Sequence, residues 1–501
     1  MENNLKPLKN TINVESSGTV ATPKDKSSVD ESEHGAYQLY PVRWAICVFF
    51  TSSIVASGLG MVGFSAITTD IADIYGVSGL VTTMLVLPFI ILFIPCIFPA
   101  NYLIDAYGIR IPVYVASVTL IIGAWIRLFV NVNFLFVVAG QVIMALGQPF
   151  MLSAPAKLAA VWFGDGEKVL ATTLGSLAAP MGAVTGFLLP LPFRMQNAYK
   201  SDVGEQRFFQ YILVQNIIIT LLGTPIIFLI KNAPPTPPSK SAQKALKTMK
   251  TGQLQSISKL LKDIDFIMLT LSFSFIYSIY TTLGACIGQL SDQFGYKSYA
   301  NSIFGTVYIV GGLFGSFAHA VLLDKYSKYK LQYMGIGIAC IIAMGAVTAV
   351  IGSHSILLSS VFITILGIAQ LPIIGVAYSF CSELTYPVNE ALSCGILQLF
   401  GSVVASILTF AVSYLLTNEH KYPACFLMIG SVTLGCFFQI FVRERLRRRR
   451  AGLKSGSFSF HAGNTNFVTP AGQGLMLDVK ATSEEESPLV FQSSSKDGLI
   501  D

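Results

Sequence analysis

Twelve long apolar runs, each about the length of a helix that crosses a bilayer, follow one another along this chain. A helix needs ~20 apolar residues to cross ~30 Å of hydrocarbon. Lipid cannot satisfy a free backbone N–H or C=O, which leaves helices and closed barrels as spanning structures. Barrel strands appear as alternating segments of ~10 residues, whereas these runs are unbroken. The sequence therefore predicts an all-α polytopic membrane protein with twelve transmembrane helices.

The runs form two groups of six, which indicates two six-helix pseudo-repeats. The predicted spans of the first group are Trp44–Thr68, Leu80–Leu103, Ile111–Val130, Phe134–Ala156, Val169–Pro190 and Phe209–Ile230. Those of the second group are Ile264–Ile287, Ser302–Leu323, Leu331–Ile351, Ile356–Ser382, Ala391–Leu416 and Tyr422–Val442.

Composition supports a membrane protein and locates its polar parts. Of the 501 residues, 53% are hydrophobic and 12% are charged, whereas soluble domains carry roughly 25% charged residues. The charged residues gather at the two ends and in a few connections. We therefore expect disordered cytoplasmic tails at 1–43 and 444–501, a linker at 231–262, and six-helix halves at 44–230 and 263–443.

The positions of lysine and arginine predict the orientation. The 231–262 segment holds seven lysines, and an arginine-rich stretch follows the last span at 443–450. Because cytoplasmic connections are enriched in Lys and Arg, the linker and both termini are expected in the cytoplasm. The plasma membrane is the default location, and an acidic organelle is the alternative.

The connection between the second and third spans carries a family motif. It reads Asn101-Tyr-Leu-Ile-Asp105-Ala-Tyr-Gly108-Ile-Arg110 and resembles the G-x-x-x-D-R/K-x-G-R signature of the major facilitator superfamily, with Asn101 in place of the leading Gly. Gly108 suits a tight turn, and the Asp105 carboxylate can face the N-terminus of the eleventh span. We expect Asp105, Gly108 and Arg110 to act in conformational gating.

Two further segments resemble one branch of that superfamily. They are Gly147-Gln148-Pro-Phe with Pro155-Ala-Lys157-Leu-Ala-Ala-Val-Trp-Phe, and Ser382-Glu383-Leu-Thr-Tyr-Pro-Val-Asn-Glu390. Both are similar to the feline leukaemia virus subgroup C receptor-related proteins, which are described as transporters of haem, choline and ethanolamine. The resemblance implies transport by alternating access. Lys157, Glu383 and Glu390, at the inner ends of spans, are expected in an inner gate.

The resemblance also implies aromatic residues around a substrate ammonium group. The choline carriers of this branch have a first-span Trp and a seventh-span Tyr at the site. Met61 stands in the Trp position here, while Tyr277 and Tyr280 are both candidates for the Tyr. Phe64, one helical turn from Met61, is a candidate replacement ring. Aromatic faces attract such cations by roughly 2 kcal/mol when desolvated.

Three glutamines inside spans complete the expected substrate site. Gln148 matches a family glutamine that lines the central cavity, and Gln370 and Gln398 are further candidates. An amide group offers both donors and acceptors, which suits a hydroxyl or carboxylate on the solute. A structural hydrogen bond between helices is the alternative for each of them.

The positions of the ionisable residues bear on whether transport is uniport or is coupled to an ion. Asp, Glu, Lys and Arg are absent from the middle of the predicted spans, which favours uniport over ion coupling.

No catalytic motif appears, and neither a cofactor nor a metal site is expected. Haem remains the alternative substrate, with His319, Cys381 and Met61 as possible axial ligands, and a transporter-like receptor or sensor is the alternative of another class. The expected partners are a small-molecule substrate and the lipid bilayer, without nucleic acid, and the chain is expected to be a monomer.

Overall fold

The computed structural model describes residues 37–447, apart from 165–166, 194–201, 240–241, 244–252, 327, 387 and 389. Every regular element in this part of the chain is a helix. Eleven helical segments within it are long and apolar enough to cross a membrane. Residues 1–36 and 448–501, which make up most of the tails that the sequence predicts to be disordered, lie outside the described residues.

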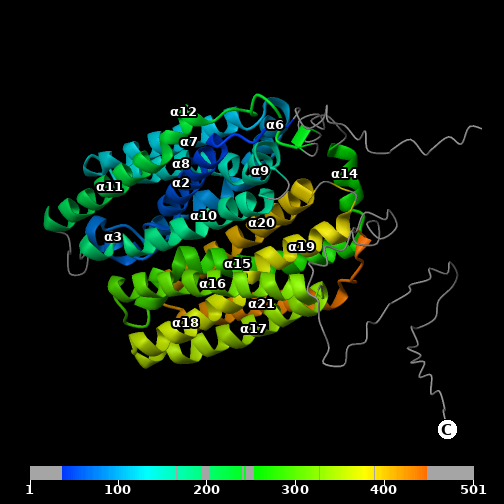
Figure 1. Cartoon of the computed structure of the whole chain (residues 1–501). Helices are drawn as coiled ribbons and strands as arrows, with labels where there is room; N and C mark the ends of the chain where they lie inside the picture. The colour runs from blue at the N-terminus through cyan, green and yellow to red at the C-terminus, as the bar shows by residue number, and fades with distance from the viewer. Residues whose placement is uncertain are drawn as a thin grey trace, which may run out of the picture. The chain divides into compact units, whose positions relative to one another are not determined.

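The helices follow the two groups of predicted spans (Figure 1). The first half contains α2 (Val42–Val62), α3 (Thr68–Tyr75), α4 (Gly79–Thr83), α5 (Leu87–Ile91), α6 (Phe93–Tyr107), α7 (Arg110–Ile126), η1 (Arg127–Asn131), α8 (Leu135–Leu152), α9 (Pro155–Trp162), α10 (Lys168–Leu188), η2 (Leu191–Phe193), α11 (Asp202–Gly223) and α12 (Pro225–Leu229). The second half contains α14 (Gln253–Leu260), α15 (Ile264–Asp292), α16 (Ser298–Tyr326), α17 (Tyr329–Val350), η3 (Ile351–Ser353), α18 (Ile356–Gln370), α19 (Pro372–Thr385), α20 (Glu390–Thr417) and α21 (Lys421–Phe441).

The second predicted span is broken into the short helices α4 and α5 and the longer α6. Pro88 lies in the first turn of α5, and Pro99 lies inside α6. Proline lacks the N–H that an interior helix position donates, so it favours a break or kink. Counted as one crossing, these pieces bring the eleven long segments to the predicted twelve.

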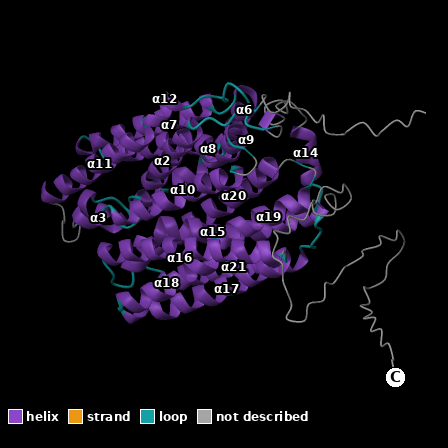
Figure 2. Cartoon of the chain, viewed as in Figure 1, coloured by secondary structure: helices purple, strands orange, loops and turns teal. Residues whose placement is uncertain are grey.

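Each half packs around its first long helix, and one apolar cluster extends across both halves. In the first half, α2 packs against α10 and α11, and in the second half α15 packs against α20 and α21. The halves meet where α10 lies against α16 and where α4, α5 and α6 lie against α20. Figure 2 shows that long helices make up almost all of the described chain. This arrangement places α2 and α15, the first helix of each half, next to the interface.

Ion pairs tie the chain within each half at the end of the bundle that carries the 231–262 segment, which we call the linker end. In the first half, Arg43 forms a two-point ion pair with Glu167, with Nε 2.8 Å from Oε2. In the second half, the buried Asp265 carboxylate lies 3.1 Å from Nε of Arg445. The arginine-rich segment after α21 therefore begins as a folded contact with the start of α15.

Candidate functional site

Tyr277, near the middle of α15, lies in a row of aromatic rings. Its ring stacks on Phe273 with centroids 5.1 Å apart and contacts Tyr280 at 5.9 Å. Gly401 of α20 permits this packing, because a Cβ there would lie 3.0 Å from both the Phe273 and the Tyr277 ring. Tyr280 keeps partial exposure, whereas Tyr277 is buried. The two tyrosines proposed from the sequence thus form one aromatic group.

A hydrogen-bond chain joins this group to α19 and α20. The Tyr378 hydroxyl donates to Oε1 of Gln398 at 2.6 Å, and Nε2 of Gln398 donates to the Tyr277 hydroxyl at 2.7 Å. Tyr378 is absent from the residues expected from the sequence. It lies in no motif and is one of 20 tyrosines, so no sequence signal distinguishes it. Tyr378 and Gln398 both keep partial exposure.

Gln370 belongs to a second chain that is fully buried inside the second half. It accepts a hydrogen bond from the Tyr308 hydroxyl at 2.7 Å and donates to the backbone oxygen of Ile276 at 3.1 Å. The Tyr308 ring stacks on Tyr280 with centroids 6.4 Å apart. Gln370 therefore lies behind the aromatic group, where its hydrogen bonds join α18 to α16 and to α15.

The first half contributes Met61 and Gln148. Nε2 of Gln148, in α8, contacts Sδ of Met61 at 3.4 Å. Met61 and Tyr280 both pack against one apolar cluster that holds residues of both halves, among them Tyr277. Met61 also packs against a small cluster that includes Ala405 of α20. The structure thus brings Met61 and Gln148 to the same interface as the aromatic group.

Phe64 lies apart from this group. Helix α2 ends at Val62, and the chain then turns, so that Phe64 is fully buried in the first half. Its ring contacts Phe208 and Tyr211 at 5.7 and 6.0 Å, and the Arg127 guanidinium lies 5.4 Å from its centroid. In this conformation Phe64 serves the core of the first half.

The two halves are hydrogen-bonded to each other at the end of the bundle opposite the linker. Nε2 of Gln289, in α15, donates to the backbone oxygen of Gly79 at 2.6 Å and to the Thr83 hydroxyl at 2.9 Å. Ser413 of α20 donates to Oε1 of Gln289 at 3.1 Å and shares a 2.6 Å hydrogen bond with Thr83. We call Gly79, Thr83, Gln289 and Ser413 the polar latch.

Close backbone packing accompanies the polar latch. A Cβ on Gly288 would lie 2.3 Å from the backbone oxygen of Ser65, so α15 meets the turn after α2 without room for a side chain. Nδ2 of Asn301, in α16, donates to the backbone oxygen of Ala66 at 3.3 Å. The bundle is therefore closed at this end.

Asp70 lies in α3 at the closed end, between the first two crossings. Its Oδ2 is buried and has no hydrogen-bond partner in the part of the chain that the structure describes. Burial raises the pKa of Asp70 to about 6, although the Ser298 hydroxyl lowers it. The carboxylates of Asp292 and Asp73 raise it further, and Lys297 opposes them.

At the linker end, the turn that carries the family motif contacts the start of the 231–262 segment. Gly108 has φ +82°, a conformation that suits glycine. Oδ1 of Asn232 accepts from the backbone N–H of Arg110 at 2.9 Å, and Nε of Arg110 donates to the Tyr114 hydroxyl at 2.9 Å. Helix α6, which carries Asp105, packs along α20. The role of this turn in gating stays a prediction.

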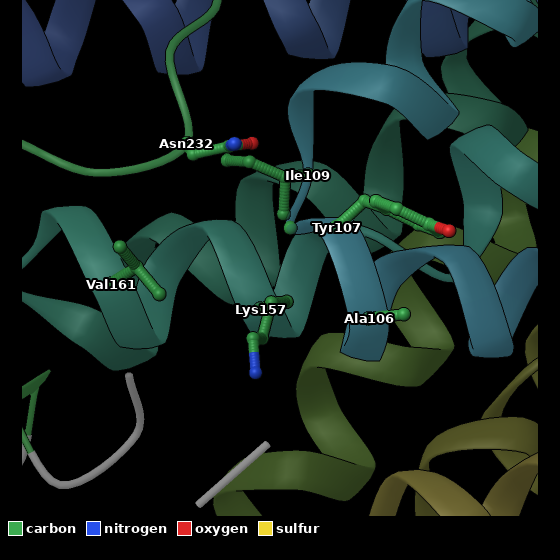
Figure 3. A pocket seen from close by; sticks show the side chains of 7 residues that line it. Ala106, Tyr107, Ile109, Lys157, Val161 and Asn232 are labelled. Atoms are coloured by element: carbon green, nitrogen blue, oxygen red, sulfur yellow. The ribbon is translucent and has the colours of Figure 1, made fainter. Parts of the chain in front are cut away.

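A pocket of about 250 Å³ lies beside this turn (Figure 3). Its lining residues are Ala106, Tyr107, Gly108, Ile109, Lys157, Val161 and Asn232. Figure 3 shows the Lys157 ammonium pointing away from Asn232. The pocket joins the motif turn to α9, which carries Lys157.

The other candidates from the sequence are dispersed. Glu383 lies near the end of α19, and Glu390 begins α20, where its side chain lies outside the described part of the chain. Of the possible haem ligands, His319 contacts Gln332 with Nδ1 3.0 Å from Nε2, and Cys381 is fully buried in α19.

Solved structures with the same arrangement of helices are membrane transporters. A bacterial homolog of the human lysosomal transporter Spinster, in an inward-facing and unoccupied conformation, has a TM-score of 0.65 at 14% identity and covers 82% of this chain and 99% of its own. A D-xylose-proton symporter has a TM-score of 0.63 at 13% identity, with 80% and 98% covered. At these identities the likeness shows a shared fold, and the predicted all-α architecture is confirmed.

Sequence relatives point to one branch of this fold. The choline/ethanolamine transporter FLVCR2 of Rattus norvegicus is 25% identical over 415 residues, which are 82% of this chain and 76% of the relative. The choline/ethanolamine transporter flvcr2a of Danio rerio is 29% identical over 473 residues, covering 91% and 96%. An uncharacterized MFS-type transporter of Caenorhabditis elegans, C09D4.1, is 27% identical over 422 residues, covering 83% and 71%.

The family model of the Major Facilitator Superfamily matches residues 48–393, which run from α2 in the first half to the start of α20 in the second. This match agrees with the two six-helix groups and with the motif turn between α6 and α7. The chain is therefore a membrane transporter that belongs to the Major Facilitator Superfamily, and within it is related to the feline leukaemia virus subgroup C receptor-related branch.

Proposed function

We propose that this transporter carries a small organic cation of the choline or ethanolamine kind by alternating access. The observation that supports this most is the aromatic group around Tyr277, which is joined through Gln398 to a hydrogen-bond chain between α15, α19 and α20. An ammonium group is attracted to aromatic faces, and an amide or phenol can bind a hydroxyl group. The names of the relatives, choline/ethanolamine transporters, support the same substrate class.

The substrate site consists of Tyr277, Tyr280 and Gln398 from the second half and Met61 and Gln148 from the first. Met61 provides a soft, polarizable wall and an acceptor for the amide of Gln148. A solute bound here contacts both halves, which is what a carrier needs when the halves rock around a site near the midplane.

Uniport is the mechanism that we propose. Among the described residues, the fully or almost fully buried charged side chains are Arg127 and Asp265, whereas Asp70 is half-buried and lies in α3, outside the long crossings. Arg127 is bound to Asn216, and Asp265 is paired with Arg445, each within its own half. Both are held structurally, which favours a cycle driven by the substrate gradient over coupling to an ion.

The linker end is assigned to the cytoplasm because lysine and arginine are enriched there. The polar latch then lies on the outer side of a plasma membrane, and this conformation is closed to the outside. Asp105, Gly108, Arg110, Lys157, Glu383 and Glu390 are proposed as the inner gate. We propose that the carrier works as a monomer.

The test is uptake of labelled choline and ethanolamine into cells that express this chain, with Gln148→Ala and Tyr280→Ala as site variants. Tyr414→Ala is the control, since Tyr414 is 53% exposed on α20 and takes no part in the site. We expect saturable uptake that Tyr280→Ala lowers by about tenfold or more, since a desolvated cation–π contact contributes about 2 kcal/mol. Gln148→Ala is expected to lower it several-fold, since one hydrogen bond contributes about 1 kcal/mol. Surface expression is expected to be unchanged in both variants. The control is expected to transport normally.

Absence of uptake above an empty vector, with the protein verified at the surface, contradicts the choline and ethanolamine proposal. The same cells are then tested with labelled haem, the alternative substrate. Equal loss in Tyr414→Ala and Tyr280→Ala shows a general effect on folding and contradicts the proposed site.

A further inference from the structure

Two hydrogen-bond chains of the same chemical composition reach neighbouring residues of α15. In each, a tyrosine hydroxyl donates to a glutamine Oε1, and the glutamine Nε2 donates onward. From Tyr308 through Gln370 the chain ends at the backbone oxygen of Ile276. From Tyr378 through Gln398 it ends at the hydroxyl of Tyr277.

The two hydrogen-bond chains differ in whether the last group still has a hydrogen to donate. A carbonyl oxygen only accepts, so the chain through Gln370 is complete. A hydroxyl group can accept one hydrogen bond and still donate its own hydrogen. Because the Tyr277 oxygen accepts from Gln398, its hydrogen remains to be donated, and no acceptor for it is found among the described residues.

The direction of the chain depends on Tyr378. The hydroxyl of Tyr378 donates to Oε1 of Gln398, which orients the amide so that its Nε2 faces Tyr277. Without this donor, the amide can turn and present Oε1 to Tyr277. Tyr277 would then donate its hydrogen to Gln398 instead of to a solute.

We propose that Tyr378 is a positioning residue, which orients Gln398 so that Tyr277 offers its hydroxyl hydrogen to an oxygen atom of the transported solute. The inference rests on the proposed function and narrows its substrate class. The solute is an organic cation that also carries a hydroxyl or carboxylate oxygen, and an amine without oxygen is bound less well.

The variant that tests this is Tyr378→Phe, which removes the hydroxyl and keeps the ring that contacts Phe273 with centroids 5.9 Å apart. Tyr308→Phe is the matched control, because it makes the same chemical change in the chain that ends at a carbonyl. Tyr277→Phe removes the offered hydrogen itself and serves as a second variant.

The measurement is uptake of labelled choline in competition with two pairs of unlabelled amines. The pairs are choline with ethyltrimethylammonium, and ethanolamine with ethylamine, and the second member of each lacks only the oxygen. We expect the wild-type chain to prefer the oxygen-bearing member by about tenfold, the scale of one buried hydrogen bond. Tyr378→Phe and Tyr277→Phe are expected to lose most of this preference, because the inhibition constant rises for the oxygen-bearing cation alone. Tyr308→Phe is expected to keep the preference.

Other outcomes separate the two proposals. If Tyr378→Phe raises the inhibition constants of both members of a pair equally, Tyr378 has a general packing role and the positioning role is contradicted. Loss of the preference in Tyr308→Phe also contradicts the positioning role. A wild-type chain that carries choline without distinguishing the pairs contradicts this inference alone. A wild-type chain at the surface that takes up neither choline nor ethanolamine contradicts the proposed function and this inference with it.

Discussion

Met61 and Phe64 differ in role although they are three residues apart. Met61 contacts Gln148 and packs against apolar clusters that hold residues of both halves. Phe64 is fully buried in the first half, where the Arg127 guanidinium lies over its ring. The guanidinium is also bound to Asn216, so Phe64 contributes to holding a buried cation. The change of role coincides with the end of α2 at Val62.

We therefore expect Phe64→Leu to change mainly the stability of the protein and Met61→Ala to change mainly the KM for choline. Phe64→Leu removes the ring beneath Arg127 and is expected to destabilise the protein by about 1–2 kcal/mol, with KM for choline unchanged. Met61→Ala removes a wall of the site and the partner of Gln148, and is expected to raise KM several-fold. Thermal unfolding of the purified protein and uptake kinetics measure the two effects.

If Phe64→Leu raised KM as much as Met61→Ala while unfolding at the wild-type temperature, Phe64 would belong to the substrate site after all. The placement of the Phe64 ring within the first half would then be irrelevant to transport.

Helix α15 carries two glycines one turn apart that meet different surroundings. A Cβ on Gly288 would lie 2.3 Å from the backbone oxygen of Ser65, in the other half. A Cβ on Gly284 would meet no atom within 4 Å. The contact between Gly288 and Ser65 forms when the end with the polar latch closes. A substitution at Gly288 therefore affects both closure and the helix, whereas the same substitution at Gly284 affects the helix alone.

Gly288→Ala is expected to hinder closure at the polar latch and to slow choline uptake by about tenfold or more, because backbone atoms cannot move aside for the methyl group. Gly284→Ala is expected to transport normally, since alanine favours a helix by ~1 kcal/mol over glycine. The population open at this end is measured by labelling Ser413→Cys, whose position is buried here, with a membrane-impermeant maleimide. Labelling at position 413 should rise when Gly288→Ala is added and should not rise when Gly284→Ala is added. Equal labelling and equal uptake in the two glycine variants would falsify the role of the Gly288 contact in closure.

At the scale of the whole molecule, the conformation closed at the polar latch holds Asp70 half-buried, near Ser298, Asp292 and Lys297 of the second half. Burial raises the pKa of this carboxyl to about 6. Opening separates α3 from the second half and exposes Asp70, which then returns towards its ordinary pKa of ~3.9. The closed conformation therefore binds the proton more tightly, and acidification between about pH 6 and pH 4 stabilises it relative to the open one.

Uptake of choline, whose charge does not change with pH, is expected to slow as the outer solution is acidified from about pH 7.5 to about pH 5. Asp70→Asn should remove most of this dependence, because its amide does not titrate. Asp73→Asn, which removes only one of the charges near Asp70, should retain it. The measurement is the initial rate of uptake against external pH. A wild-type rate that rises on acidification, or a dependence that survives in Asp70→Asn, would contradict this view of the gate.

The number of crossings, their grouping into two halves and the superfamily were all predictable from the sequence. The bilayer imposes a length and an apolar composition on each crossing, and these are local properties that a sequence displays directly. The glycine at Gly108 follows from the chemistry of a tight turn. The sequence predicts the second span as one run, and its division near Pro88 is a difference that the proline explains. Met61, Gln148, Tyr277 and Tyr280 could be named from the resemblance to the branch, and Gln398 could be named as a glutamine inside a predicted span.

Only the tertiary structure decided which of these side chains meet. The sequence predicts a first span that continues to Thr68 and puts Phe64 on the face of Met61, whereas α2 ends at Val62 and the chain turns Phe64 into the first half. Tyr378 joins Gln398 and Tyr277 from 20 and 101 residues away. Such contacts depend on how helices distant in sequence pack and where they end, and no local pattern of residues records either.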